Sequence, residues 1–109
     1  MAKATSNIFD QFIGKYVIVR SYNEGVNCGF LEAAESGVCV LRDARRMWYH
    51  TPQDKTQSWY EGVANTGLSE DSNMSAPVQQ KVIVEDYSIT VCSEIGQASL
   101  IMAPNHAQS

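Results

Sequence analysis

Three of the four arginines in this chain lie in the segment RDARRMWYH, residues 42 to 50, directly before Trp48, Tyr49 and His50. The rest of the chain is acidic, and the formal net charge over 109 residues is −4. A guanidinium group can hold a phosphate with two parallel hydrogen bonds, and it can also stack on a base. An aromatic ring that stacks on a base contributes ~1–3 kcal/mol. The segment therefore predicts a binding site for a ligand that carries both phosphates and a base.

Residues earlier in the chain add to this site. Arg20 and Tyr22 lie on one face of a predicted strand, and Asn27 follows the next turn. In this hypothesis the guanidiniums hold phosphates, the aromatic rings sandwich a purine, and Asn27 reads an adenine edge or a ribose. The predicted ligand-binding residues are Arg20, Tyr22, Asn27, Arg45, Arg46, Trp48 and Tyr49.

Strand alternation separates the two adjacent arginines. If the segment stays extended, Arg45 shares a face with Met47, whereas Arg46 shares a face with Trp48. Only one of the two arginines then lines a pocket, and the sequence favours Arg46. A structural interpretation also stays open, in which Trp48 is buried, the guanidiniums are solvated or paired with carboxylates, and Asn27 caps a turn.

Residues that could carry out catalysis are few. The only histidines are His50 and His106, and the carboxylate pairs at 70–71 and 85–86 are adjacent in sequence, so on a strand their members point to opposite faces. No phosphate-binding glycine loop is present. Two histidines and three dispersed cysteines offer no metal-ligand spacing. The sequence predicts no catalytic residue, no metal site and no cofactor, and it predicts reduced thiols at Cys28, Cys39 and Cys92.

Three strands must position the arginines and aromatic residues. Residues 15–22, 26–34 and 38–50 are rich in β-branched and aromatic residues and are separated by the turn sequences NEG and ESG. Tight turns between consecutive strands predict an antiparallel meander. The third strand is expected to bend near Asp43 and Ala44, and Pro52 ends it.

A helix is predicted over 54–67. Asp54 and Gln57 have the spacing of a capping box, and Gly67 is placed to follow the last turn. Trp59 and Tyr60 are expected in the core, because a helix on a sheet buries its apolar face.

The remaining segments are a polar loop at 68–78, a strand at 79–93 with a possible break near 85–86, and a helix at 93–102 capped by Ser93. A short helix capped by Ser6 is predicted over 6–13. The expected sheet core of the second half comprises Val82, Val84, Ile89 and Val91.

These elements predict an α+β fold, an antiparallel meander sheet with one or two helices packed on one face. The expected division is a lead-in at 1–14, a single ligand-binding domain at 15–103 and a flexible tail at 104–109. The net charge argues against duplex nucleic acid as a partner. No apolar run is long enough to span a membrane, and no signal peptide is seen, so a cytoplasmic protein is expected.

Three stretches resemble a family of small phage proteins, the Thoeris anti-defence sponges. They are IVRSYNEGV, CGFLE close behind it, and an apolar strand that runs into ARRMWYH. The likeness covers residues 15 to 93 and is specific in the first half. The site residues that it implies are Arg20, Tyr22, Arg45, Arg46, Trp48 and Tyr49.

The resemblance implies that the protein sequesters a nucleotide second messenger of a bacterial immune system without degrading it. The implied ligands are cyclised ADP-ribose isomers, glycocyclic ADP-ribose first, or cyclic oligonucleotides, which would block Thoeris or CBASS signalling. It also implies a homo-oligomer, a dimer or a hexamer formed by dimers, in the cytoplasm of an infected bacterium. Two alternatives stay open, a protein–protein interaction module of a phage or mobile element and an enzyme that cleaves the messenger with His50 as base.

Overall fold

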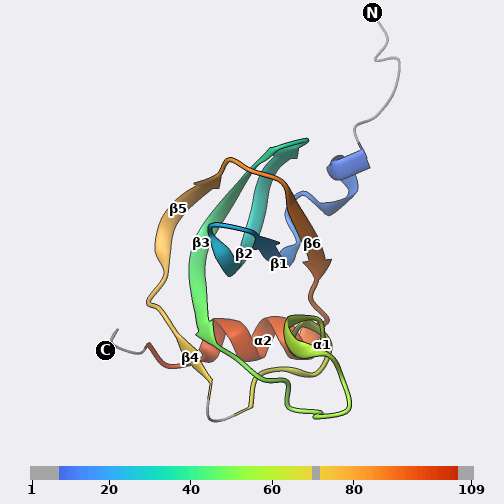
Figure 1. Cartoon of the computed structure of the whole chain (residues 1–109), viewed down its shortest axis with the longest axis vertical. Coiled ribbons are helices and arrows are strands. Elements are labelled where there is room, and N and C mark those ends of the chain that lie inside the picture. The colour runs from blue at the N-terminus through green and yellow to red at the C-terminus, as the bar shows by residue number, and fades with distance from the viewer. Residues whose placement is uncertain (1–7, 70–71, 106–109) are drawn as a thin grey trace, which may run out of the picture.

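The computed structural model describes residues 8–69 and 72–105, and its first three strands form the predicted meander. β1 (Tyr16–Ser21), β2 (Gly25–Glu35) and β3 (Val38–Tyr49) pair antiparallel in chain order (Figure 1). Gly25 begins β2 with φ of 74°, a conformation that glycine adopts without steric cost. The α+β class predicted from the sequence is confirmed.

The second half of the chain extends both edges of this meander. β5 (Val78–Ile83) pairs with β3, and β6 (Tyr87–Val91) pairs with β1, so the predicted strand breaks at 84–86 as expected. β5 and β6 therefore lie at opposite edges of the meander, and the β5–β6 connection crosses one end of the sheet (Figure 1). A two-residue strand that was not predicted, β4 (Asn73–Met74), pairs with the end of β3. Within residues 8–69 and 72–105 the sheet has six strands.

β3 is irregular near Asp43, where a bend was predicted, because its register with β2 shifts between the pairs Cys28–Arg45 and Phe30–Arg42. Asp43 has φ of 53° and is the only non-glycine residue with positive φ in the described ranges. An aspartate tolerates this left-handed conformation better than most residues do. β3 pairs with β5 from Cys39 to Ala44, with Arg42 opposite Gln80, and further along it pairs with β4, with Met47 opposite Met74.

Two helices pack at one end of the sheet (Figure 1). α1 (Trp59–Thr66) begins later than the predicted 54–67, because the Asp54 carboxylate accepts hydrogen bonds from the amide and hydroxyl of Thr56 in a local turn. Gly67 ends the helix as predicted, with φ of 94° and its amide bonded to the Val63 carbonyl.

α2 (Glu94–Met102) is capped by Ser93, whose hydroxyl accepts a hydrogen bond from the Gly96 amide at 3.0 Å, as predicted. A Cβ atom at Gly96 would overlap the carbonyl oxygen of Ala64, so the two helices touch through their backbones. The first element is a 3-10 helix, η1 (Ile8–Phe12), and its predicted cap Ser6 lies outside the described residues. Within the described ranges neither helix is long and apolar enough to cross a membrane.

The sheet separates two hydrophobic clusters. One lies between the sheet and the helices and includes Tyr16, Ile18, Val63 and Leu100. The other lies on the opposite face and contains Val17, Val19, Leu31, Cys39, Leu41, Ala44 and Ile83.

The expected core of the second half was largely wrong. Val82 and Val84 are 51% and 73% exposed, because Ile83 between them points to the buried face. Val91 pairs with buried Val17 but stays 41% exposed on the edge strand β6, whereas Ile89 packs against the core.

Candidate functional site

The four arginines occupy four different environments, and Arg45 is the most buried of them. Its side chain is 3% exposed. The guanidinium donates to the carbonyl oxygens of Ser75 (2.8 Å), Leu100 (2.7 Å) and Pro104 (3.2 Å), and to Oδ1 of Asn105 (3.1 Å). These bonds join β3 to the end of α2, where the negative end of the helix dipole favours a cation. The Arg45 guanidinium, which was predicted to contact the ligand, therefore already donates its hydrogen bonds to other residues of the protein.

Arg42 is paired on the surface. Its Nη1 lies 3.0 Å from Oδ2 of Asp43, and its guanidinium lies 4.7 Å from the centre of the Phe30 ring. The structural interpretation of the sequence allowed for such pairing of a guanidinium with a carboxylate. Both charged side chains are about half exposed.

Arg20 and Arg46 have no hydrogen-bond or ion-pair partner for their guanidiniums within residues 8–69 and 72–105. Arg20 pairs across strands with Val26, and Arg46 with Asn27, so the two arginines flank the start of β2. Both side chains are exposed. They are the two guanidiniums available to an anionic ligand.

The turn between β1 and β2 lies beside these two arginines. Tyr22 in this turn is 92% exposed, and Nη2 of Arg46 lies 3.3 Å from the position that a Cβ atom on Gly25 would occupy. The absence of a side chain at Gly25 lets the guanidinium lie against the turn. Arg20, Tyr22, Gly25 and Arg46 are called the basic rim from here on, because they lie at the end of the sheet where side chains from both faces reach solvent.

The other predicted aromatic contacts lie further along β3. Trp48 is 38% exposed, whereas Met47 before it is 3% exposed, as strand alternation predicted. Tyr49 occupies the last position of β3, but its side chain lies outside the part of the chain that is described.

Asn27 is buried beneath the basic rim and belongs to a polar cluster. Its Nδ2 donates to the Glu24 carbonyl at 3.1 Å, and its Oδ1 accepts from Lys81 Nζ at 3.1 Å. Lys81 also lies 3.1 Å from Oε1 of Glu24. Asn27, predicted to read an adenine or ribose, therefore links β2 to β5 at only 1% exposure. The proximity of Lys81 to this end of β2 could not be seen in the sequence, because it depends on how β5 returns to the sheet.

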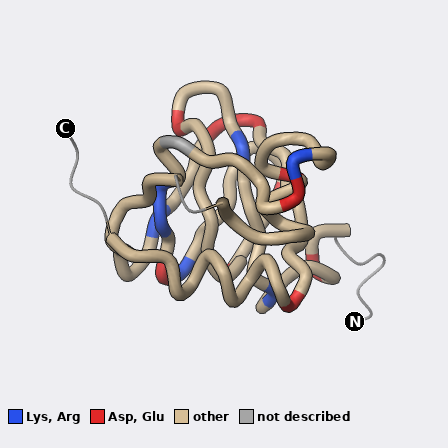
Figure 2. Tube along the Cα trace, turned by 90° about the horizontal axis from the view of Figure 1, so that it is seen from below, with Lys and Arg blue, Asp and Glu red and all other residues tan. Residues whose placement is uncertain are grey.

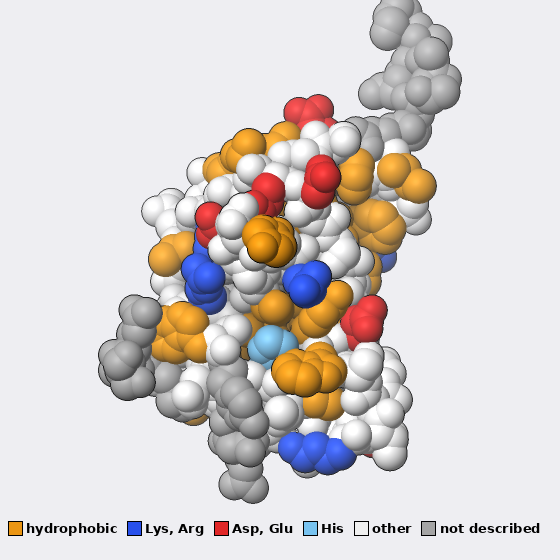
Figure 3. Space-filling view, viewed as in Figure 1, with side chains coloured by type: hydrophobic (Ala, Val, Ile, Leu, Met, Phe, Trp, Pro, Cys, Tyr) orange, Lys and Arg blue, Asp and Glu red, His pale blue; other side chains and the backbone are white. Residues whose placement is uncertain are grey.

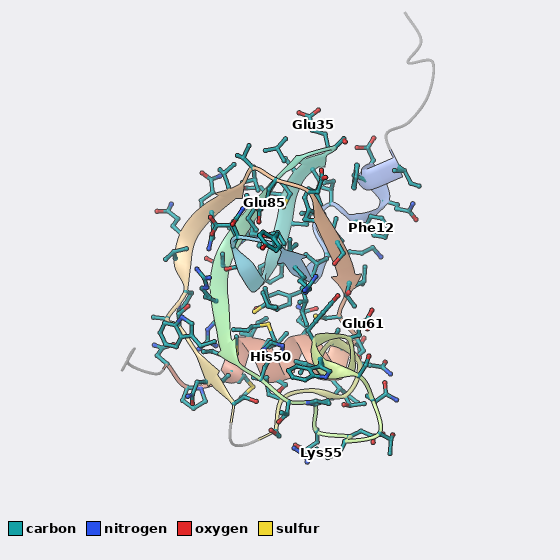
Figure 4. The ribbon with its side chains drawn as sticks, in the orientation of Figure 1. Phe12, Glu35, His50, Lys55, Glu61 and Glu85 are labelled. Carbon is teal, nitrogen blue, oxygen red and sulfur yellow. The ribbon has the colours of Figure 1, made fainter. Side chains whose placement is uncertain are left out.

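Glu85 stabilises the β1–β2 turn, which belongs to the basic rim, through hydrogen bonds. Its carboxylate accepts hydrogen bonds from the Asn23 amide (2.8 Å), the Asn23 side chain (2.9 Å) and the Glu24 amide (3.1 Å). Figure 4 places Glu85 on the β5–β6 connection, over the turn. The nearby Ser21 hydroxyl and these donors hold the pKa of Glu85 at about 2, well below its usual range. The carboxylate is therefore ionised at neutral pH.

His50 and Trp59 lie next to each other, and the His50 ring is visible on the face shown in Figure 3. Their ring centres are 6.5 Å apart in an edge-to-face arrangement. His50 is 9% exposed, and burial lowers the pKa of its ring, so the ring is neutral at pH 7. Trp59 is 70% exposed, which contradicts its predicted place in the core, because α1 begins at this residue.

Figure 3 shows the face that carries these residues. Basic side chains lie on both sides of a hydrophobic area, with the His50 ring below it. Elsewhere basic and acidic positions are interspersed along the trace (Figure 2). Acidic side chains also lie on the face shown in Figure 3, above the basic ones.

The thiols are protonated at neutral pH. Burial raises the pKa of Cys28 and of Cys39 to about 11, and that of Cys92 to about 12. All three cysteines are free, and the Tyr16 hydroxyl donates to the Cys28 sulfur at 3.4 Å. In the described part of the chain, no group of three histidine, cysteine, aspartate or glutamate side chains is arranged to hold a metal ion.

The fold and this face define a small antiparallel α+β protein with an open basic and aromatic surface beside the β1–β2 turn. Residues 14–100 match a family described as a domain of unknown function (DUF6948), and the chain belongs to this family. No curated protein and no solved structure matches the chain.

Proposed function

We propose that this protein is a phage-encoded sponge that binds and sequesters, without degrading, a nucleotide second messenger of bacterial immunity. The observation that carries the proposal is the pair of exposed guanidiniums, Arg20 and Arg46, which have no partner in the described ranges and flank the start of β2, beside the turn that carries exposed Tyr22. Phosphates would bind the two arginines, and an adenine would stack on Tyr22 or Trp48. The resemblance of residues 15 to 93 to the Thoeris anti-defence sponges supplies the ligand class. That class is glycocyclic ADP-ribose or a cyclic oligonucleotide, the signals of Thoeris and CBASS defence.

The acidic composition is compatible with such a ligand. A diphosphate needs two or three well-placed cations, and each hydrogen bond to a charged group contributes ~1.5–3 kcal/mol. It does not need a basic surface of the kind that duplex nucleic acid requires.

The basic rim is open, and Tyr22 is 92% exposed. A second copy of the chain would shield a ligand bound there, which supports a homo-oligomer, a dimer or a larger assembly of dimers. The protein would act in the cytoplasm of the infected bacterium, where these messengers are made.

The test is a depletion and release assay. The protein is incubated with glycocyclic ADP-ribose or with a cyclic oligonucleotide and removed by filtration, and the retained fraction is then heated. We expect the free nucleotide to be depleted and then recovered intact. The Arg46→Gln and Arg20→Gln variants should each bind at least about tenfold more weakly, because each loses one charge-assisted contact.

Arg42→Gln is the matched control, because it removes the same group from a surface arginine that already has partners. It should bind as the unmodified protein does. Recovery of cleaved nucleotide, lost in His50→Ala, would instead indicate an enzyme. No depletion of any nucleotide would reject the sponge.

A protein–protein interaction module is the second candidate. The outer face of β5 exposes Val78 and Val82, and Val84 follows them in the β5–β6 connection. This apolar strip on an edge strand could pair with another chain. A thermal-shift screen separates the two functions, since a ligand at 100 times its dissociation constant adds ~2.7 kcal/mol to the free energy of unfolding. No shift with any nucleotide would favour the interaction module.

A further inference from the structure

A third cation lies beside the basic rim but is neutralised. Lys81 Nζ is 3.1 Å from Oε1 of Glu24 and 3.1 Å from Oδ1 of Asn27. Lys81 and Glu24 remain accessible, with side-chain exposures of 24% and 41%. Asn27 is opposite Arg46 in the β2–β3 ladder, and Gly25 next to Glu24 contacts the Arg46 guanidinium. The Lys81 ammonium and the Arg46 guanidinium therefore both lie beside the start of β2, Lys81 at Asn27 and Arg46 near Gly25.

Glu24 is the acidic group best placed to leave this cluster. Glu85 is held by three hydrogen bonds to the turn, whereas in the described ranges Lys81 is the only partner of the Glu24 carboxylate. The Lys81 ammonium can keep its bond to Asn27 when Glu24 moves away. A phosphate oxygen can replace a carboxylate oxygen as an acceptor for lysine without any change in the backbone.

We infer that Lys81 is a phosphate-binding residue and that Glu24 is a built-in competitor, which the ligand's phosphate displaces from Lys81. The ligand class is a nucleotide with at least two phosphates, one on Arg46 and one on Lys81. This inference rests on the proposed function and assigns a regulating pair to the same site. Because Glu24 competes, ligands with a single phosphate gain less from Lys81 than ligands with two.

The test compares two substitutions that each remove one negative charge. Glu24→Gln keeps an amide oxygen as an acceptor for Lys81, and Asp43→Asn removes the carboxylate of the surface pair with Arg42. Asparagine tolerates the positive φ of position 43, so this control should keep the fold. Binding of ADP-ribose and of inorganic pyrophosphate is measured by titration calorimetry.

We expect Glu24→Gln to bind both probes about tenfold more tightly and Asp43→Asn to bind them as the unmodified protein does. Lys81→Met should bind about tenfold more weakly, and Lys81→Arg should retain most of the binding. Melting temperatures of all variants are recorded, because a purely structural role of the Glu24–Lys81 pair lowers stability in Glu24→Gln without tightening binding.

Three results have different meanings. In the first, Glu24→Gln and Asp43→Asn bind the probes equally, the unmodified protein binds nucleotide, and Arg46→Gln does not. This result overturns the inference about Glu24 and Lys81 and leaves the proposed function standing. A Lys81→Met variant that melts normally and binds normally also overturns it. If neither probe binds the unmodified protein or any variant, this inference fails, whereas the proposed function is decided by the depletion and release assay.

Discussion

At the scale of single residues, neighbouring arginines differ in role because strand alternation turns them to opposite faces. Arg45 and Met47 are each 3% exposed, whereas Arg46 is exposed and Trp48 is 38% exposed. This division was predictable, because only the two-residue period of a strand is needed. The acceptors of Arg45 were not predictable, since they lie 30 to 60 positions away in the chain.

Substitution of Arg45 tests its structural role. Arg45→Met should lower the free energy of unfolding by ~3 kcal/mol, because buried carbonyl oxygens lose hydrogen bonds from a charged donor. The measurement is urea denaturation followed by tryptophan fluorescence. Arg42→Met, at a half-exposed position, is the control and should change stability by less than ~0.5 kcal/mol. An equally small effect at Arg45 would show that its hydrogen bonds do not stabilise the fold.

At the scale of elements, the sequence predicted best those strands that are joined by tight turns. β1, β2 and β3 begin and end within one residue of the predicted boundaries, because turn residues and alternation act locally. α1 was predicted too long, since Asp54 forms a turn with Thr56 rather than capping the helix. The prediction of which face of β5 is buried was also wrong. Pairing with β3 decides whether Val82 or Ile83 points into the core, and a shift of one residue exchanges the two faces.

The contact between the β5–β6 connection and the β1–β2 turn predicts a dependence of stability on pH. The pKa of Glu85 is lowered from its ordinary value of 4.5 to about 2 in the folded protein. The stabilisation by Glu85 is therefore fully present above about 4.5 and is lost as the pH falls towards about 2.

Glu85→Gln should remove this dependence, so its stability deficit is largest at neutral pH and shrinks in acid. The free energy of unfolding of both proteins is measured from neutral pH down to about 2. Glu35→Gln, at the far end of the sheet, is the control (Figure 4). A deficit that stays constant with pH would contradict the assignment of the low pKa to Glu85.

At the scale of the whole molecule, the chain combines an acidic composition with one basic rim. The sequence predicted the α+β class, and it selected Arg20, Tyr22 and Arg46 as surface candidates. It did not select Lys81, Glu24 or Trp59, because their positions depend on how β5 and α1 return to the sheet. The nucleotide ligand is our proposal, which rests on the chemical type of these residues and on the family resemblance.

The four bonds of Arg45 also bear on the order in which the molecule folds. Three of them reach residues 55 to 60 positions further on, whereas β1, β2 and β3 pair with their neighbours in the chain. Contacts between distant parts of a chain generally form after local ones. The end of α2 should therefore close over the sheet late, after the folding transition state.

The late closure of α2 can be tested by folding kinetics. Arg45→Met should speed unfolding by roughly tenfold or more and leave the refolding rate nearly unchanged in stopped-flow experiments, because the lost bonds are absent from the transition state. Slower refolding with an unchanged unfolding rate would instead show that α2 packs on β3 before the folding transition state. If the expected rates are found, the lifetime of the native state depends on the bonds of Arg45 to Leu100, Pro104 and Asn105. The proposed ligand would nevertheless bind to β1, β2 and β3, the strands that form first.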